Sequence, residues 1–261
     1  MPKQAVGTLV REWRMQRHRS QLDLALEVGV SARHLSFVET GRANPSPELV
    51  LALAGGLDVP LRERNTLLLA AGYAPRYQET SLDDPAMAMM HAAIQRLLDA
   101  HDPYPGLVID RHWNVVLTNR AATVLVTGLP VDLLGPPLNV YRVCLHPDGL
   151  ASRTRNFPAW ATYLLHQLRR SVVLTNDPSL AALQDEVNAY PNVAALTAQR
   201  GAAWEDPPIL VPVELDLGGT VVSLFTTLTT FGTPRDITLD ELAVELFFPA
   251  DDQTAALLRS S

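Results

Sequence analysis

One short stretch restricts the fold of this chain more than any other part of its 261 residues. Residues 21–40, QLDLALEVGVSARHLSFVET, carry apolar side chains where two crossing helices must bury them, at Leu24, Val28, Val30, Leu35 and Val38. Ala25 falls where the helices would touch, and a larger side chain there would push them apart. Gly29 falls at the turn, where its freedom to adopt a positive φ suits a tight connection. The stretch therefore predicts two short helices joined by a tight turn.

The flanking sequence predicts three more helices. Apolar residues recur at helical spacing over residues 6–13, and residues 61–71 form another helical pattern. Ser46 is a typical N-cap for a further helix between these segments. We therefore expect an all-α domain of five helices over residues 1–73, with a helix-turn-helix motif at its centre. An ordinary helical hairpin is the alternative.

The segment SQLDLALEVGVSARHLSFVETGRANPS resembles the Cro/repressor-type helix-turn-helix domain of the Xre family, and the resemblance extends over residues 5–72. It implies a five-helix fold and a double-stranded DNA operator as the partner. It also implies that Gln21 contacts a phosphate and that the first residues after the turn face base edges. The residues that we expect at the DNA are Gln21, Ser31, Ala32, Arg33, His34, Ser36, Phe37, Arg42 and Asn44. Many relatives carry Gln at two recognition positions, so Ala32 and Phe37 imply a different base readout.

Arg33 is the strongest candidate for base recognition. Its guanidinium can pair bidentately with O6 and N7 of guanine, and a phosphate contact is an equal alternative. Residues 1–77 contain 10 basic and seven acidic residues, a net charge of +3, whereas residues 78–261 contain 11 and 21, a net charge of -10. This asymmetry predicts a polyanionic partner for the N-terminal part alone. The small positive excess favours salt-dependent binding by a homodimer.

Two charged residues of the N-terminal domain have a separate expected role. In the resembled family, an Arg in the first helix pairs with a Glu at the end of the recognition helix. Arg14 and Glu39 fit these two positions. The resemblance therefore implies a structural ion pair between them and no DNA contact, and the loss of one partner would leave a poorly compensated charge.

The chain changes character after the helical domain. Residues 74–84 are polar and unpatterned, which is typical of a linker. A helical pattern over 85–101 is followed by two short strand patterns between 106 and 119. Further helical patterns follow, and three β-rich runs close the chain, with a Gly218-Gly219 hairpin turn between the first two. Strands at both ends with helices between them predict an α+β domain over residues 85–261.

Three segments of this second domain resemble the ligand-binding domain of MmyB-like transcription regulators, which has a PAS-like fold. They are PYPGLVIDRHWNVVLTNRAA, LNVYRVCLHPDG and NFPAWATYLLHQLRR. With the N-terminal domain, the resemblance covers residues 5–250. It implies a transcription regulator whose PAS-like domain binds a small apolar, fatty-acid-like ligand. The sequence departs from the family pattern at Leu138-Asn139 and Cys144-Leu145.

Apolar stripes and a few polar residues are candidates for the ligand site. The residues that we expect at the ligand are Trp113, Asn119, Asn139, Arg142, His146, Trp160, Tyr163 and Leu164. Arg142 or His146 could hold a carboxylate. The alternatives are that the apolar residues form the core and that Asn119 caps a helix. A second alternative function is a C-terminal domain that serves only dimerisation, without a physiological ligand.

Several other classes of protein are disfavoured. The sequence has no HExxH, GxSxG, P-loop or GxGxxG motif, and its C-terminal histidines lack metal-ligand spacing, so we expect no enzyme, no cofactor and no metal site. The single cysteine, Cys144, excludes an internal disulfide. No apolar run approaches the ~20 residues that span a bilayer, and the N-terminus lacks an apolar signal core. We therefore expect a cytoplasmic protein.

Overall fold

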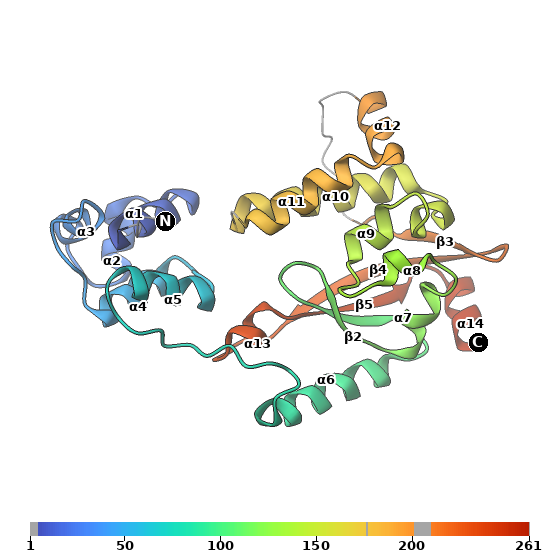
Figure 1. The fold of residues 1–261 in the computed structure, drawn as a ribbon, viewed down its shortest axis with the longest axis horizontal. Helices are drawn as coiled ribbons and strands as arrows, with labels where there is room; N and C mark the ends of the chain where they lie inside the picture. Colours follow the sequence, from blue (N-terminus) through green and yellow to red (C-terminus); the bar gives the residue numbers. More distant parts are fainter. Residues whose placement is uncertain (1–4, 176, 201–209, 261) are drawn as a thin grey trace. The chain divides into compact units, whose positions relative to one another are not determined.

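The computed structural model describes residues 5–175, 177–200 and 210–260. The chain folds into two compact units (Figure 1). The first unit comprises the chain up to Ser81 together with Gly232–Asp240, and the second comprises Leu82–Phe231 and the chain from Glu241. Among the described helices, none is long and apolar enough to cross a membrane.

The first unit contains the five expected helices. They are α1 (Val6–Gln16), α2 (Gln21–Glu27), α3 (Ala32–Glu39), α4 (Pro47–Gly56) and α5 (Leu61–Ala70). The hydroxyl groups of Ser20, Ser31 and Ser46 each accept a hydrogen bond from the backbone N–H three residues further on. These N-caps satisfy backbone donors that would otherwise be unpaired, which explains why α2, α3 and α4 begin where they do.

The turn between α2 and α3 has the expected geometry. Gly29 has a φ of 74°, in the left-handed region where a side chain would be strained. Ala25 is buried, as the close approach of the two helices requires. Of the five predicted apolar positions, Leu24, Leu35 and Val38 are buried and Val28 and Val30 are half-buried. The helix-turn-helix prediction is confirmed.

Gly7 allows α1 to pack closely against the end of α3. A Cβ atom built on Gly7 would lie 2.1 Å from the carbonyl oxygen of Val38 and 2.9 Å from that of Glu39. Backbone atoms cannot move aside as a flexible side chain can. The contact between α1 and α3 therefore depends on the missing side chain of Gly7.

A distant segment of the chain completes the first unit. Asp240, in α13 (Ile237–Glu241), accepts a hydrogen bond of 2.8 Å from the backbone N–H of Leu61 at the start of α5. Asp236 accepts a hydrogen bond of 2.7 Å from the hydroxyl of Thr80. The N–H of Ile237 donates to the carbonyl of Gln78. The compact unit therefore extends to Ser81, beyond the expected boundary at residue 73, because polar side chains and backbone groups hold residues that lack an apolar pattern.

The second unit is built on a five-stranded antiparallel sheet. The strands are β1 (Gly106–Ile109), β2 (Val115–Thr118), β3 (Val213–Leu217), β4 (Thr220–Thr230) and β5 (Ala243–Pro249), in the order β2-β1-β5-β4-β3. Gly218 and Gly219 form the hairpin turn between β3 and β4, with φ of 69° and 93°. The curled sheet and its strand order confirm the predicted α+β, PAS-like fold.

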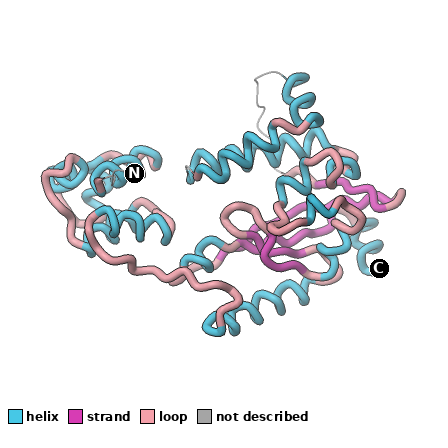
Figure 2. Tube along the Cα trace, in the orientation of Figure 1, coloured by secondary structure: helices cyan, strands magenta, loops and turns pink. Residues whose placement is uncertain are grey.

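Helices cover both faces of this sheet (Figures 1 and 2). One face packs against α6 (Ala88–His101), whose Leu98 lies beside Leu246 of β5. The other face is covered by helices that follow β2 in the chain. They are α7 (Arg120–Leu125), α8 (Val131–Leu134), α9 (Val140–Leu145) and α10 (Phe157–Thr175). Helix α11 (Pro178–Asn188) packs against α9 and α10, and α12 (Pro191–Arg200) packs against α11. A last helix, α14 (Asp252–Ser260), contacts β4 and β5.

Candidate functional site

The predicted DNA-contacting residues gather on α3 and its flanks. Arg33, His34, Arg42 and Asn44 are exposed. The hydroxyl of Ser31 caps α3 by accepting a hydrogen bond from the N–H of His34. The remaining residues on this helix are half-buried, and they are Ala32, Ser36 and Phe37. Thus eight of the nine candidates lie on α3 or on the short segments beside it, with Gln21 as the exception at the start of α2.

Phe37 holds two arginines near the recognition helix. The guanidinium carbon of Arg33 lies 5.3 Å from the centroid of the Phe37 ring, and that of Arg42 lies 6.0 Å away. Both distances fit cation–π contacts, and arginine keeps its hydrogen-bond donors free at the edge of the plane while its face stacks. Arg33 and Arg42 are nine positions apart in the sequence, and their contacts with the Phe37 ring hold both positive charges on the same surface.

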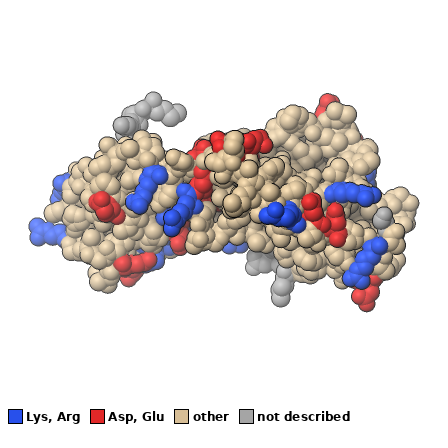
Figure 3. Space-filling model, turned by 90° about the horizontal axis from the view of Figure 1, so that it is seen from below, with Lys and Arg blue, Asp and Glu red and all other residues tan. Residues whose placement is uncertain are grey.

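Basic and acidic side chains are mixed on the face of the molecule that Figure 3 shows. No single sign of charge dominates that face, in keeping with the small net charge of the N-terminal residues. A strong, sequence-independent electrostatic attraction to DNA therefore has little support from charge alone.

The ion pair that the resemblance implied is present and joins three elements. Arg14 contacts both carboxylate oxygens of Glu39, with Nε–Oε1 of 2.6 Å and Nη2–Oε2 of 3.0 Å. A third donor, Nε2 of Gln21, lies 2.7 Å from Oε2 of Glu39. Arg14 also donates to the carbonyl of Arg19. The side chain of Glu39 is only 1% exposed, so these donors replace its hydration, and the hydrogen bond to Glu39 raises the pKa of Arg14.

The side-chain amide of Gln21 is therefore directed at Glu39 in this structure. Its expected phosphate contact stays a prediction.

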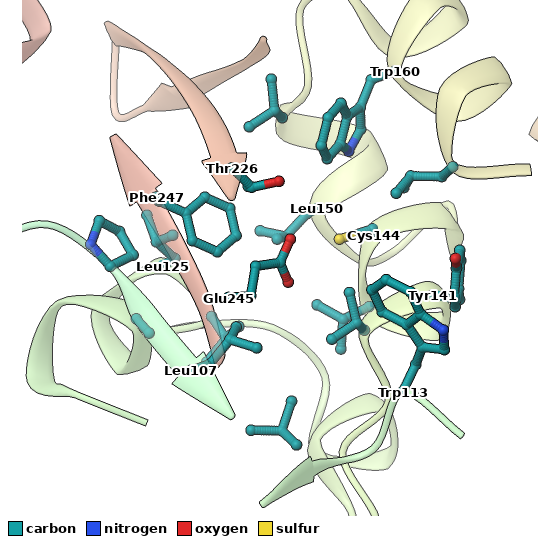
Figure 4. A pocket seen from close by; sticks show the side chains of 18 of the residues that line it. Leu107, Trp113, Leu125, Tyr141, Cys144, Leu150, Trp160, Thr226, Glu245 and Phe247 are labelled. Atoms are coloured by element: carbon teal, nitrogen blue, oxygen red, sulfur yellow. The ribbon is translucent and has the colours of Figure 1, made fainter. Parts of the chain in front are cut away.

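A cavity of about 90 Å³ lies in the second unit between the sheet and helices α7, α9 and α10. Four of the predicted ligand residues line it, and they are Trp113, Trp160, Tyr163 and Leu164. Most of the other lining residues are aliphatic and come from all five strands and from the helices (Figure 4). An apolar enclosure with few polar groups is the usual form of a small-molecule site.

Glu245 of β5 is an acidic residue inside this apolar cavity, and the sequence analysis missed it. Figure 4 shows its side chain reaching from β5 towards the middle of the cavity, with Cys144 opposite. The residue is only 6% exposed. Desolvation raises the pKa of its carboxyl group to about 7, and a hydrogen bond with Thr226 lowers it in part. The available signal was an acidic residue in the middle of the apolar run ELAVELFF.

Two polar atoms of the cavity lack partners. Within the described part of the chain, neither Oε2 of Glu245 nor the hydroxyl of Tyr141 has a hydrogen-bond partner. Both residues line the cavity and are buried. Buried polar groups in native proteins are almost always paired, so these two atoms are hydrogen-bonding groups that the cavity offers to a molecule inside it.

Asn119 and Asn139 do not line the cavity; both hold backbone in place. Oδ1 of Asn119 accepts hydrogen bonds from the N–H groups of Gly106 and Ala122, and its amide donates to two carbonyls. Asn139 caps α9 by accepting from Tyr141, and its amide donates to the carbonyl of His112. Each amide is fully used in fixing the loops around β1 and β2. The helix-capping alternative describes Asn119 in this structure.

Arg142 and His146 also lie outside the cavity lining. The guanidinium of Arg142 forms a bidentate pair with Glu186, with both N–O distances at 2.8 Å. Tyr190 donates to the same carboxylate, and its ring packs edge-on against His146 at 5.0 Å. These contacts link α9 to α11 and its C-terminal end. The expectation that Arg142 or His146 holds a ligand carboxylate finds no support in this geometry.

The comparisons with known proteins give the family. Residues 90–260 match the MmyB-like transcription regulator ligand binding domain, and residues 10–64 match a helix-turn-helix family. The chain belongs to the MmyB-like transcription regulators. It is thus a transcription regulator with a helix-turn-helix DNA-binding domain and an MmyB-like ligand-binding domain.

Two mycobacterial proteins are similar to this MmyB-like regulator over most of their length. The uncharacterized HTH-type transcriptional regulators Rv0023 of Mycobacterium tuberculosis (strain ATCC 25618 / H37Rv) and Mb0023 of Mycobacterium bovis (strain ATCC BAA-935 / AF2122/97) are each 30% identical to it over 224 residues. The alignments cover 83% of this chain and 77% of each relative. A solved structure of an RNA-binding Light-Oxygen-Voltage receptor aligns with 97% of this chain and 57% of its own, at 14% identity and a TM-score of 0.27. That likeness is too weak to inform the function.

Proposed function

We propose that this regulator binds a specific DNA operator through α3, as a homodimer in the cytoplasm. The exposed side chains of Arg33 and His34 on α3, and of Arg42 after it, support this proposal. Side chains in the first turns of a recognition helix reach base edges in the major groove. A dimer doubles the contacts made by a domain of small net charge and matches a two-fold operator.

We further propose that the PAS-like domain binds a small apolar, fatty-acid-like ligand in the cavity around Glu245. The observation that carries this proposal is an apolar enclosure that contains two unpaired polar atoms. A separate hollow of about 380 Å³ has Pro105 and Leu125 in common with the lining of the cavity. A ligand regulates DNA binding only if it binds the DNA-competent and DNA-incompetent states with different affinity.

Substitution of Arg33 tests the DNA half of the proposal. An operator is first selected from random duplexes, and its binding to wild type, Arg33→Ala and Arg96→Ala is measured by fluorescence anisotropy. Arg96 is an exposed arginine on α6 in the second unit, so its removal controls for the change in net charge. We expect Arg33→Ala to lose about 1–3 kcal/mol of binding free energy and Arg96→Ala to bind like wild type. Equal affinities and sequence preferences in all three proteins would remove Arg33 from the interface.

A substitution that fills the cavity tests the ligand half. Organic extracts of purified wild type, Leu164→Trp and Leu97→Trp are compared by mass spectrometry, with an unrelated protein as a blank. Leu164 lines the cavity, whereas Leu97 is exposed on α6. We expect a stoichiometric apolar compound in wild type and Leu97→Trp that is depleted in Leu164→Trp, and this compound should change operator affinity when added back. Equal extracts from all three proteins, with no compound above the blank, would favour the dimerisation-only alternative.

A further inference from the structure

The described lining of the cavity carries one carboxylic acid, Glu245, and no basic side chain. Of the described residues, Glu245 is the only one of the cavity lining with a side chain that can carry a charge near neutral pH. The other titratable lining groups are Tyr141 and Cys144 on α9 and Tyr163 on α10. Burial raises the pKa of Cys144 to about 12 and that of Tyr141 well above its usual value, so both stay neutral. The described lining of the cavity therefore holds no cation that could balance an ionised ligand headgroup.

The hydrogen bonds of Glu245 show which atom is free for a ligand. Thr226, on the neighbouring strand β4, hydrogen-bonds to the carboxyl group. Oε2 has no partner among the described residues, and Figure 4 shows the carboxyl group facing the middle of the cavity. The hydroxyl of Tyr141, another residue of the cavity lining, is a second polar group without a partner among the described residues. A protonated carboxyl group can donate one hydrogen bond to a ligand, whereas a carboxylate can only accept.

The charge of the ligand follows from this arrangement. An anionic ligand would bury its charge without a counter-ion, because the described lining of the cavity holds no cation, and two carboxylates there cannot both be ionised. A cationic ligand would require a buried ion pair with one hydrogen bond from Thr226 to support it, and the desolvation of both ions opposes such a pair. An uncharged oxygen on the ligand meets neither penalty and can pair with the unpaired oxygen of Glu245.

We propose that protonated Glu245 donates a hydrogen bond to an uncharged oxygen atom of the ligand, so that the cavity selects neutral amphipathic molecules, such as alcohols or ketones, over carboxylates and amines. This inference rests on the proposed ligand site, and it narrows the ligand there from a fatty-acid-like molecule to a chain-like molecule with an uncharged headgroup. Binding of a ligand whose oxygen can only accept, such as a ketone, then requires the proton on Glu245 and weakens as this group ionises with rising pH. His101 of α6 contacts the backbone carbonyl of Phe247 and does not line the cavity.

Three probes of equal chain length test the proposal: 2-octanone, whose oxygen can only accept a hydrogen bond, octanoate and octylamine. Their binding to full-length protein, stripped of co-purified compounds, is measured by calorimetry at about pH 6 and about pH 8.5. We expect 2-octanone to bind best at the lower pH and to lose roughly tenfold or more in affinity at the higher pH, because only protein with a protonated Glu245 can donate to it. Octanoate should bind weakly at both values.

The variant Glu245→Gln carries the permanent hydrogen-bond donor of an amide and cannot ionise. It should bind 2-octanone with the same affinity at both pH values, while Glu214→Gln, on the sheet outside the cavity, should behave like wild type. Preferential binding of octylamine, or unchanged pH dependence in Glu245→Gln, would overturn the role of Glu245 and leave the ligand site standing. If no probe binds, and Leu164→Trp and wild type give identical extracts, the ligand site itself is refuted.

Discussion

Two buried carboxyl groups, Glu39 and Glu245, have opposite surroundings. Glu39 receives three side-chain hydrogen bonds, two from Arg14 and one from Gln21. Glu245 hydrogen-bonds with Thr226 and keeps one oxygen unpaired in the described structure. The first arrangement stabilises a charge inside the fold, whereas the second leaves the group ready for a partner from outside.

Removal of Glu39 should therefore destabilise the first unit. In Glu39→Ala, the guanidinium of Arg14 stays largely buried without its counter-ion, and we expect a loss of about 3–5 kcal/mol in the free energy of unfolding. Urea denaturation followed by circular dichroism measures this loss. The matched control is Glu27→Ala, because Glu27 is 46% exposed and pairs with Arg19 at the surface. That variant should lose no more than about 1 kcal/mol, and a similar effect in both would refute the special role of Glu39.

At the level of residues, the sequence predicted local roles better than the ligand site. The capping serines and the exposed candidates on α3 follow from local patterns, and Arg14 and Glu39 follow from a family resemblance. Glu245 was missed because its burial depends on long-range packing of β5 between β1 and β4. Arg142 appeared suited to an anion in the sequence, but Glu186, 44 residues away along the chain, already occupies its guanidinium. Such pairings cannot be deduced from spacing alone.

Among the elements, α1 and α3 are joined through the backbone contact at Gly7. We expect Gly7→Ala to destabilise the protein by about 1–3 kcal/mol or more, because a methyl group would overlap the carbonyl of Val38. Gly55→Ala, inside α4, is the matched control, since nothing lies within 4 Å of its added methyl group. That control should be neutral or stabilise the helix by up to about 1 kcal/mol. Thermal unfolding with equal midpoints in the two variants would contradict the close contact.

The elements themselves were largely predictable, and their arrangement was predictable only in part. Helical periodicity, N-caps and the Gly218-Gly219 turn are local signals. The periodicity predicted the helices, and the N-caps and the turn predicted where elements begin and end. The position of β5 between β1 and β4 is set by pairing across the chain, which no local pattern contains. Residues 76 and 77 are held by the side-chain amide of Asn65, so a polar segment that looked like a linker is in part fixed to α5.

At the scale of the whole molecule, the chain crosses between the two units three times. The chain passes from the first unit to the second after Ser81, returns after Phe231 and leaves again after Asp240. The returning segment connects β4 to β5, and β5 carries Glu245. Strands that line the cavity therefore continue directly into residues that hydrogen-bond to α5 and to Thr80.

This path limits how the protein can be divided. A fragment that stops at Ser81 loses Asp236 and Asp240, and with them the carboxylate that accepts a hydrogen bond from the first N–H of α5. A protease that cuts once between residues 81 and 82 leaves the N-terminal piece attached to Gly232–Asp240 by non-covalent contacts alone. A gene fusion that replaces the chain up to Ser81 would exchange the N-terminal part of the first unit and leave the original Gly232–Asp240 segment in place. The first unit therefore cannot be exchanged as one continuous segment, and a working chimaera must transplant two separate stretches of sequence.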